Sequence, residues 1–193
     1  EGHSSVVELL LKADGVDVNK AREDGITPLY IASRESHASV VELLLTADGV
    51  DVNKAREDGI TPLCWAAQEG HASVVELLLK ADGVDVNKGY KDGATPLFIA
   101  SQNGHPSVVE LLLKADGVDV NKGDKDGTTP LLIAASFDHS SVVELLLKAD
   151  GVDVNKEDKD GTTPLFWAAQ EGHTSVVELL LADGVDVNNA RED

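Results

Sequence analysis

The stretch DGTTPLFWAAQEGHTSVVELLLADGVDVN, residues 160–188, contains the start and stop signals of two helices. Thr163 precedes a proline, and a threonine N-cap followed by proline at the first helical position begins a helix. Gly172 can take the left-handed backbone conformation with which many helices end. Ser175 and Glu178 have the S-x-x-E spacing of a capping box, and an apolar run follows them. The stretch therefore predicts a helix, a tight turn and a second helix that begins at the serine.

These signals recur along the chain at a fixed period of 34 residues. T-P-L begins at Thr27, Thr61, Thr95, Thr129 and Thr163, and histidines stand at positions 3, 37, 71, 105, 139 and 173. Such a period indicates stacked supersecondary units that bury their apolar faces against their neighbours. We therefore expect residues 1–193 to form a single repeat array. Its complete units are predicted at 17–50, 51–84, 85–118, 119–152 and 153–185, with partial units at 1–16 and 186–193.

Each unit should contain a finger followed by two helices. The segment ADGVDVNKxxxDG is rich in turn residues and predicts a β-turn or hairpin finger that projects from the array. Alanines line the first helix and bulky Val and Leu line the second, so the stack should curve, with the first helices and fingers on its concave side. Ser36 and Asp138 replace the glycine that ends the first helix, at a conformational cost. The expected fold class is all-α, a solenoid of helix-turn-helix units without an extended sheet.

The stretch 160–188 resembles the ankyrin repeat, with its T-P-L-H-x-A motif, and the resemblance covers the whole chain in several copies. It implies an ankyrin-type α-solenoid that binds other proteins. The period is one residue longer than the family's usual ~33. The histidine after T-P-L is replaced in every unit, by Tyr30, Cys64, Phe98, Leu132 and Phe166. In the family that imidazole joins neighbouring units by hydrogen bonds, so apolar contact is expected to replace it here.

The composition limits the classes of partner. The chain has 16 Lys and Arg against 35 Asp and Glu, and its net charge of −19 disfavours nucleic acid and anionic membranes and favours a protein partner with a basic patch. Its apolar runs are far shorter than the ~20 residues that cross a bilayer, and no signal peptide opens it. The single cysteine excludes an internal disulfide. We expect a cytoplasmic protein, and the lack of methionine indicates an internal or processed fragment.

No residue pattern predicts catalysis, a metal site or a cofactor. Successive histidines should lie one packed helix apart, ~8–10 Å, which is too far for one zinc ion, and a role in the turn between the helices is preferred. The acidic segment KEDKDG begins with lysine, and Trp167 stands where an EF-hand has its glutamate. Cys64 is expected to be a small core residue, because no base stands beside it. Trp65 and Trp167 are expected to fill the core between units.

Positions that differ between the copies indicate which residues stacking leaves free. Variation concentrates at the finger tips and at the end of the first helix, both expected on the concave face. Neutral drift at exposed positions is the alternative explanation. The predicted protein-binding residues are Arg22, Glu23, Ile26, Arg34, Glu35, Arg56, Glu57, Ile60, Gln68, Glu69, Tyr90, Lys91, Ala94, Gln102, Asn103, Lys125, Thr128, Ser136, Phe137, Lys159, Thr162, Gln170 and Glu171.

Phe137 stands at the end of a first helix, where the other copies have Glu35, Glu69, Asn103 and Glu171. It is either an exposed apolar anchor for a partner or folds onto the adjacent unit while Asp138 caps the helix. The expected function is a monomeric, non-enzymatic protein-binding module. A structural spacer or a head-to-tail self-assembling array is the alternative, because neither end has a polar capping unit. Hydroxylation of the DVN asparagines is a weaker third hypothesis.

Overall fold

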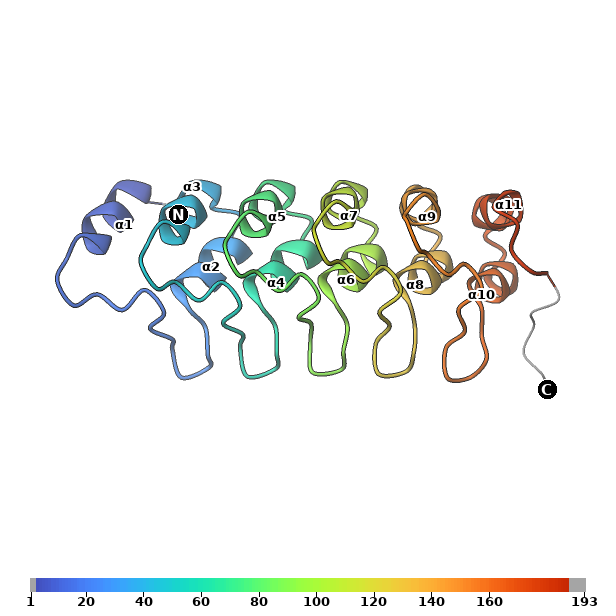
Figure 1. Ribbon diagram of the computed structural model, residues 1–193, viewed down its shortest axis with the longest axis horizontal. Helices are drawn as coiled ribbons and strands as arrows, with labels where there is room; N and C mark the ends of the chain where they lie inside the picture. The colour runs from blue at the N-terminus through green and yellow to red at the C-terminus, as the bar shows by residue number, and fades with distance from the viewer. Residues whose placement is uncertain (1–2, 188–193) are drawn as a thin grey trace.

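Residues 3–187 are described by a computed structural model, and within that range the chain contains α-helices but no β-strand. The helices form two layers, and fingers extend from one side of them (Figure 1). The inner helices, nearer the fingers, are α2 (Pro28–Arg34), α4 (Pro62–Gln68), α6 (Pro96–Gln102), α8 (Pro130–Ser136) and α10 (Pro164–Glu171). The outer helices are α1 (Ser4–Leu11), α3 (Ala38–Leu45), α5 (Ala72–Leu79), α7 (Pro106–Leu113), α9 (Ser140–Leu147) and α11 (Thr174–Ala182).

Each layer is a row of helices packed on their neighbours. Consecutive inner helices are in contact, consecutive outer helices are in contact, and each inner helix also packs on the outer helix that follows it. Alanines such as Ala66 and Ala100 are fully buried in the inner layer, and Val75 and Leu78 are fully buried in the outer layer. Small side chains thus let the inner helices approach closely. The predicted all-α solenoid of stacked helix pairs is confirmed.

The predicted threonine N-caps are present in all the inner helices. In α4, Thr61 Oγ1 accepts a hydrogen bond from the backbone N–H of Cys64 at 3.1 Å, and proline occupies the first turn. Equivalent bonds of 3.1–3.2 Å begin the other four inner helices. Each bond satisfies a backbone donor that the helix leaves free at its start, and such a cap typically contributes ~1 kcal/mol.

The predicted capping boxes of the outer helices are wrong. Helix α3 begins at Ala38, so Ser39 lies inside its first turn, and the N-cap is His37, whose side chain makes no capping hydrogen bond. The backbone carbonyl of His37 accepts hydrogen bonds from the N–H groups of Val40 and Val41, at 3.0 Å each. The other outer helices also begin after a histidine. The serine therefore stands two positions after the N-cap and cannot cap the helix.

The inner helices end where the sequence indicated. Gly172 caps α10 with φ 77°, in the left-handed region. Ser36 and Asp138 take the place of this glycine with φ 57° and 58°. A side chain in this conformation costs roughly 1–2 kcal/mol, so both residues carry the predicted strain.

Candidate functional site

Each finger tip is a tight turn closed by backbone hydrogen bonds. In the second finger, the N–H of Arg56 donates to the carbonyl of Ile60 and the N–H of Gly59 donates to the carbonyl of Arg56, both at 3.0 Å. The other fingers repeat this pattern. The turn brings the chain back toward the next inner helix, so the tip residues form a narrow edge.

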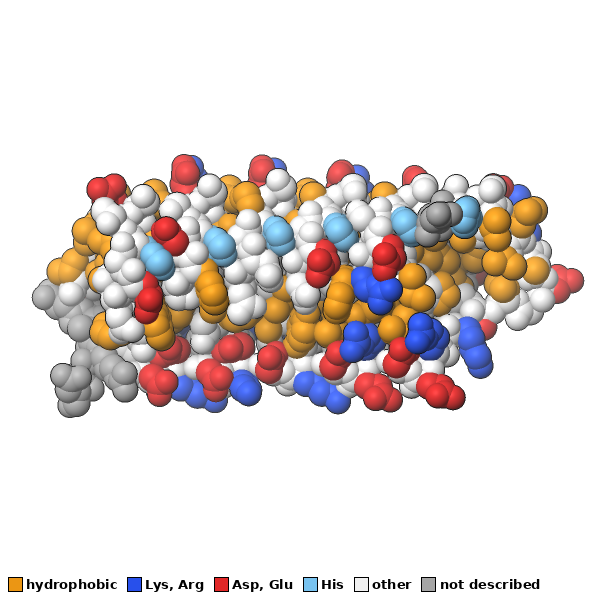
Figure 2. Space-filling view, turned by 180° about the vertical axis from the view of Figure 1, so that it is seen from behind, with side chains coloured by type: hydrophobic (Ala, Val, Ile, Leu, Met, Phe, Trp, Pro, Cys, Tyr) orange, Lys and Arg blue, Asp and Glu red, His pale blue; other side chains and the backbone are white. Residues whose placement is uncertain are grey.

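Neighbouring finger tips are bonded to each other. The N–H of Lys91 donates to the carbonyl of Asp58 at 3.2 Å, and the N–H of Lys125 donates to the carbonyl of Asp92 at 2.6 Å. Gly59 has φ 89°, and a Cβ there would lie 3.0 Å from the backbone nitrogen of Lys91, which explains the constant glycine at this position. The second to fifth fingers are therefore joined in one edge, since the N–H of Lys159 also donates to the carbonyl of Asp126 at 2.9 Å. Both acidic and basic side chains lie along the finger edge (Figure 2).

The finger tips and the C-terminal ends of the inner helices form a surface that we call the finger–helix face. Nineteen of the predicted contact residues have side chains that are exposed or half-buried there. The exposed ones are Arg22, Glu23, Glu35, Glu57, Glu69, Lys91, Asn103, Lys125, Phe137, Lys159, Gln170 and Glu171. The half-buried ones are Arg34, Arg56, Gln68, Tyr90, Gln102, Thr128 and Ser136.

Four predicted contact residues require correction, because Ile26, Ile60, Ala94 and Thr162 are buried. Each stands where the finger returns to the inner helix, and its carbonyl accepts the hydrogen bond that closes the finger tip. Ile26 and Ile60 belong to the apolar cluster that contains Tyr30. Variation between the copies predicts exposure, but at this position the differing side chains fill the core in different ways. These four side chains are not available to a partner.

Charge on the finger tips changes along the array. In the first two fingers, Arg22 pairs with Asp24 at 3.3 Å and Arg56 pairs with Asp58 at 2.8 Å. In the later fingers, Lys91, Lys125 and Lys159 are exposed and make no ion pair with any residue in 3–187. The finger edge thus offers unpaired positive charge in the middle and C-terminal units, although the chain as a whole is strongly acidic.

Two tyrosines connect the fingers to the inner helices by hydrogen bonds. Tyr90 donates a hydrogen bond from its hydroxyl to Gln68 Oε1 at 2.5 Å, and burial raises the pKa of Tyr90 far above its usual value. Tyr30 is fully buried, and its hydroxyl accepts a hydrogen bond from Arg56 Nη1 at 3.2 Å. Each tyrosine therefore links an inner helix to a neighbouring finger.

Phe137 is the large apolar side chain of the finger–helix face. It is the C-cap of α8, and 54% of it is exposed. Its ring stacks on His139 of the same unit, with centroids 6.2 Å apart and an interplanar angle of 14°. The alternative in which Phe137 folds onto the adjacent unit is therefore wrong, whereas Asp138 does end the helix with φ 58°.

The residues considered for chemistry have structural contacts. Cys64 is fully buried, its thiol donates to the carbonyl of Lys88 at 3.2 Å, and burial raises its pKa, so the thiol stays protonated. Trp65 is half-buried beside Tyr30 of the preceding unit, with ring centroids 5.8 Å apart, which confirms its core-filling role. Trp167 is half-buried, and its ring meets that of Phe166 edge-on.

The histidines between the helices join neighbouring units, a role that the sequence reasoning missed. Four of these histidines place Nε2 2.9–3.1 Å from the last carbonyl oxygen of the inner helix in the preceding unit. They are His71, His105, His139 and His173. They form one row along the array (Figure 2). The expectation that apolar contact alone would join the units is therefore wrong, because these histidines add hydrogen bonds between them.

Asparagines form a second ladder between units. Asn53 Nδ2 donates to the carbonyl of Gly83 at 2.7 Å, and Asn53 Oδ1 accepts from the N–H of Asp85 at 2.8 Å. Asn19, Asn87 and Asn121 make the same pair of bonds. These bonds fix each finger base to the next.

Residues 3–187, which the structure describes, show neither a metal-binding cluster nor a membrane-spanning helix. They contain no group of three or more His, Cys, Asp or Glu side chains placed to hold a metal ion. None of their helices combines the length and the apolar character needed to cross a membrane.

Stacked pairs of short helices with bonded fingers define an α-solenoid repeat protein. A family model described as ankyrin repeats (3 copies) matches residues 1–56, 49–124 and 116–191. The chain belongs to the ankyrin repeat family. Members of this family are in general protein–protein interaction modules without enzymatic activity. A search of the curated proteins found no match.

Proposed function

We propose that this protein binds a protein partner through the finger–helix face, chiefly at Tyr90, Lys91, Asn103, Lys125 and Phe137 in the middle units. The observation that carries the proposal is the 54% exposure of Phe137 beside polar residues. An apolar ring of this size costs free energy in water, and a partner that covers it recovers that cost. The predicted concave shape of this face and the division into five complete units are part of the proposal.

The unpaired lysines indicate the chemistry of the partner on one side of Phe137. Lys91 and Lys125 are exposed on neighbouring finger tips that are joined by the backbone bond from Lys125 to Asp92. We infer that the partner places acidic side chains against these tips. Basic side chains elsewhere on the partner are attracted by the net charge of −19 of the chain, which speeds their approach. A compartment inside the cell, as expected from the sequence, fits such a module.

A photo-crosslinking experiment tests the proposal. A photoreactive phenylalanine is placed at position 137 and, as a matched control, at position 144 on outer helix α9, and each variant is exposed to cell extract. A protein captured at 137 and not at 144 is purified, and its affinity is measured for the wild type and for Phe137→Ala. Weaker binding by Phe137→Ala supports the proposal. A footprint confined to the outer helices refutes it.

Self-assembly remains the second candidate function, because apolar residues are exposed near both ends of the array. Leu9 and Leu10 are exposed on α1, and Leu181 is exposed on α11. Sedimentation velocity over a wide concentration range separates the two functions. A concentration-independent monomer supports the binding module, and growing oligomers support the array.

A further inference from the structure

The turn after α8 contains a residue that costs stability, Asp138. Its φ of 58° lies in the left-handed region, and three other units have a glycine at this position, namely Gly70, Gly104 and Gly172. Asp138 also places a carboxylate just beyond the C-terminal end of α8, where the helix dipole disfavours negative charge. A strained residue that the fold does not require is often found at a functional position. The contacts of the carboxylate show whether the fold requires it.

The fold makes no use of the Asp138 carboxylate. The side chain is 53% exposed, and its carboxylate accepts no hydrogen bond among residues 3–187. Its Oδ2 lies 3.9 Å from Nδ1 of His173. The Nε2 atom of His173 lies 3.1 Å from the carbonyl oxygen of Ser136, so Nε2 carries the hydrogen and Nδ1 of the neutral ring presents a lone pair to the carboxylate. The carboxylate is therefore open to a donor from outside the chain.

Phe137 presents an aromatic ring beside this carboxylate. Its side chain is 54% exposed, and its ring stacks on His139 with an interplanar angle of 14°. His139 is held in turn by the contact of 2.9 Å between its Nε2 and the carbonyl oxygen of Gln102. The stack thus supports the ring from one side and leaves more than half of the side chain open. A guanidinium group matches this arrangement, because it stacks on aromatic rings and donates paired hydrogen bonds to carboxylates.

The charges around Phe137 favour a cation. Residues 130–139 and 164–173, which cover α8, α10 and the turns after them, contain no lysine or arginine. Apart from histidine, their ionisable residues are Asp138 and Glu171. Glu171 is exposed at the position that corresponds to Phe137 in the next unit, and α10 packs on α8. Both carboxylates and the C-terminal end of α8 therefore attract a positively charged side chain.

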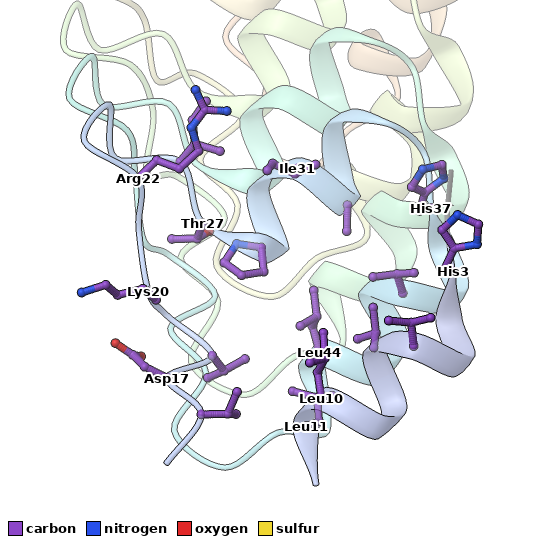
Figure 3. A pocket seen from close by; sticks show the side chains of 18 residues that line it. His3, Leu10, Leu11, Asp17, Lys20, Arg22, Thr27, Ile31, His37 and Leu44 are labelled. Atoms are coloured by element: carbon purple, nitrogen blue, oxygen red, sulfur yellow. The ribbon is translucent and has the colours of Figure 1, made fainter. Parts of the chain in front are cut away.

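The first unit shows that the left-handed residue alone does not make such a site. Ser36 has φ 57° there and also replaces a glycine. Glu35 stands in place of Phe137, and its carboxylate pairs with Arg34 at 2.6 Å. His37, which corresponds to His139, lies beyond the end of α2 (Figure 3). This unit has no aromatic ring at the turn, and its carboxylate is already paired within the chain.

We propose that Phe137 and Asp138 bind an arginine side chain of the partner protein, with the guanidinium stacked on the open face of the Phe137 ring and donating to the Asp138 carboxylate. The inference rests on the proposed function and deepens it, because it names the residue type that covers Phe137. Arginine fits better than lysine, since its planar group can stack on the ring and bond to the carboxylate at once.

The probe is the peptide acetyl-Gly-Arg-Gly-amide, titrated into the isotope-labelled whole chain at low ionic strength and followed by amide NMR signals. The sequence Phe137-Asp138-His139 occurs once in the chain, so its signals are distinct from those of the repeated segments. We expect these signals to shift saturably. The same peptide with citrulline, a neutral isostere of arginine, should bind at least ~5-fold more weakly, because it loses the positive charge that both contacts use.

Three variants locate the site. Asp138→Asn keeps a residue that tolerates the left-handed conformation and should weaken binding of the arginine peptide by about threefold to fivefold. Asp138→Gly should weaken it as much, although glycine relieves the strain, so unfolding cannot explain the loss. Phe137→Ala should weaken it by about twofold to fivefold, the value of an exposed cation–π contact. Asp150→Asn is the control, because it removes an equal charge from an exposed position after α9 and should change the affinity by less than about twofold.

Three results would overturn the proposal. The first is equal binding of the arginine and citrulline peptides. The second is an affinity that falls as much with Asp150→Asn as with Asp138→Asn, since the peptide would then sense only the net charge of the chain. The third is a partner whose affinity falls with Phe137→Ala but not with Asp138→Asn, which would support the finger–helix face and reject arginine as the residue that covers Phe137.

Discussion

The Nε2 atom of His105 lies 2.9 Å from the backbone carbonyl oxygen of Gln68, the residue that ends the preceding inner helix. A carbonyl oxygen can only accept, so Nε2 carries the hydrogen and donates it. The bond satisfies a carbonyl that α4 leaves free at its C-terminal end. One side chain thereby joins the end of one unit to the turn of the next.

Replacing His105 by alanine should lower the free energy of unfolding by ~1–2 kcal/mol, because it leaves the half-buried carbonyl without its partner. His37→Ala is the matched control, since His37 has the same position in its unit but no hydrogen bond to its ring among residues 3–187. That variant should lose less than ~0.5 kcal/mol. Urea denaturation followed by circular dichroism measures both, and equal losses would show that the bond contributes nothing.

Asp138→Gly should stabilise the array by ~1 kcal/mol, because glycine takes the left-handed conformation without the clash of a Cβ atom. The substitution also removes the contact of 3.9 Å between Asp138, which is exposed, and His173, which is half-buried, and such a long contact contributes little. Ser136→Gly, at the last residue of α8, is the control and should destabilise by a similar amount. If both glycine variants are less stable than the wild type, Asp138 carries no strain.

Phe137→Ala and Phe98→Ala should differ sharply in thermal or urea unfolding. Phe98 is 5% exposed in an apolar cluster, so its truncation should cost ~3–5 kcal/mol. Phe137 is more than half exposed, and its truncation should change stability by less than ~0.5 kcal/mol. A large loss with Phe137→Ala would mean that its ring supports the fold and would weaken its assignment as a binding anchor.

The helices could be predicted from the sequence because their signals are local. Thr61 and its proline fix the start of α4 within a few residues of chain, and the family period fixes the order of the units. The capping boxes failed for a local reason too. The S-x-x-E spacing was correct, but His37 rather than Ser39 has the non-helical backbone of an N-cap.

Contacts between units could not be read in the same way. His105 and Asn53 recur in every copy, and this constancy indicates that stacking requires them. It does not say which atoms they join across 30 or more residues of chain. The candidate surface shows the opposite difficulty. Ile26 and Lys91 both stand at variable positions, but only the folded finger shows that the first points inward and the second outward.

Alkaline pH should reveal the contribution of Tyr90. Its pKa is raised above the ordinary value of 10.0 by burial, so the folded state keeps the phenol proton at a pH where the unfolded chain loses it. Stability from this group is therefore complete below about pH 10 and is lost progressively as the pH rises above that value. Burial raises the pKa of Tyr30 and Cys64 as well, and these groups act in the same direction.

Tyr90→Phe separates the contribution of Tyr90 from the others. Near neutral pH the variant should be less stable than the wild type by ~0.5–1.5 kcal/mol, because the hydrogen bond to Gln68 is lost. Phenylalanine does not ionise, so the variant should lose less stability than the wild type between about pH 8 and about pH 11, and the difference between the two should shrink. Tyr30 and Cys64 are unchanged in both chains, so their titration cancels in this comparison. Urea unfolding at a series of pH values gives the two curves. Parallel curves would show that Tyr90 ionises equally in the folded and unfolded states. The Tyr90 hydroxyl, which bonds to Gln68 of α4, would then be open to solvent.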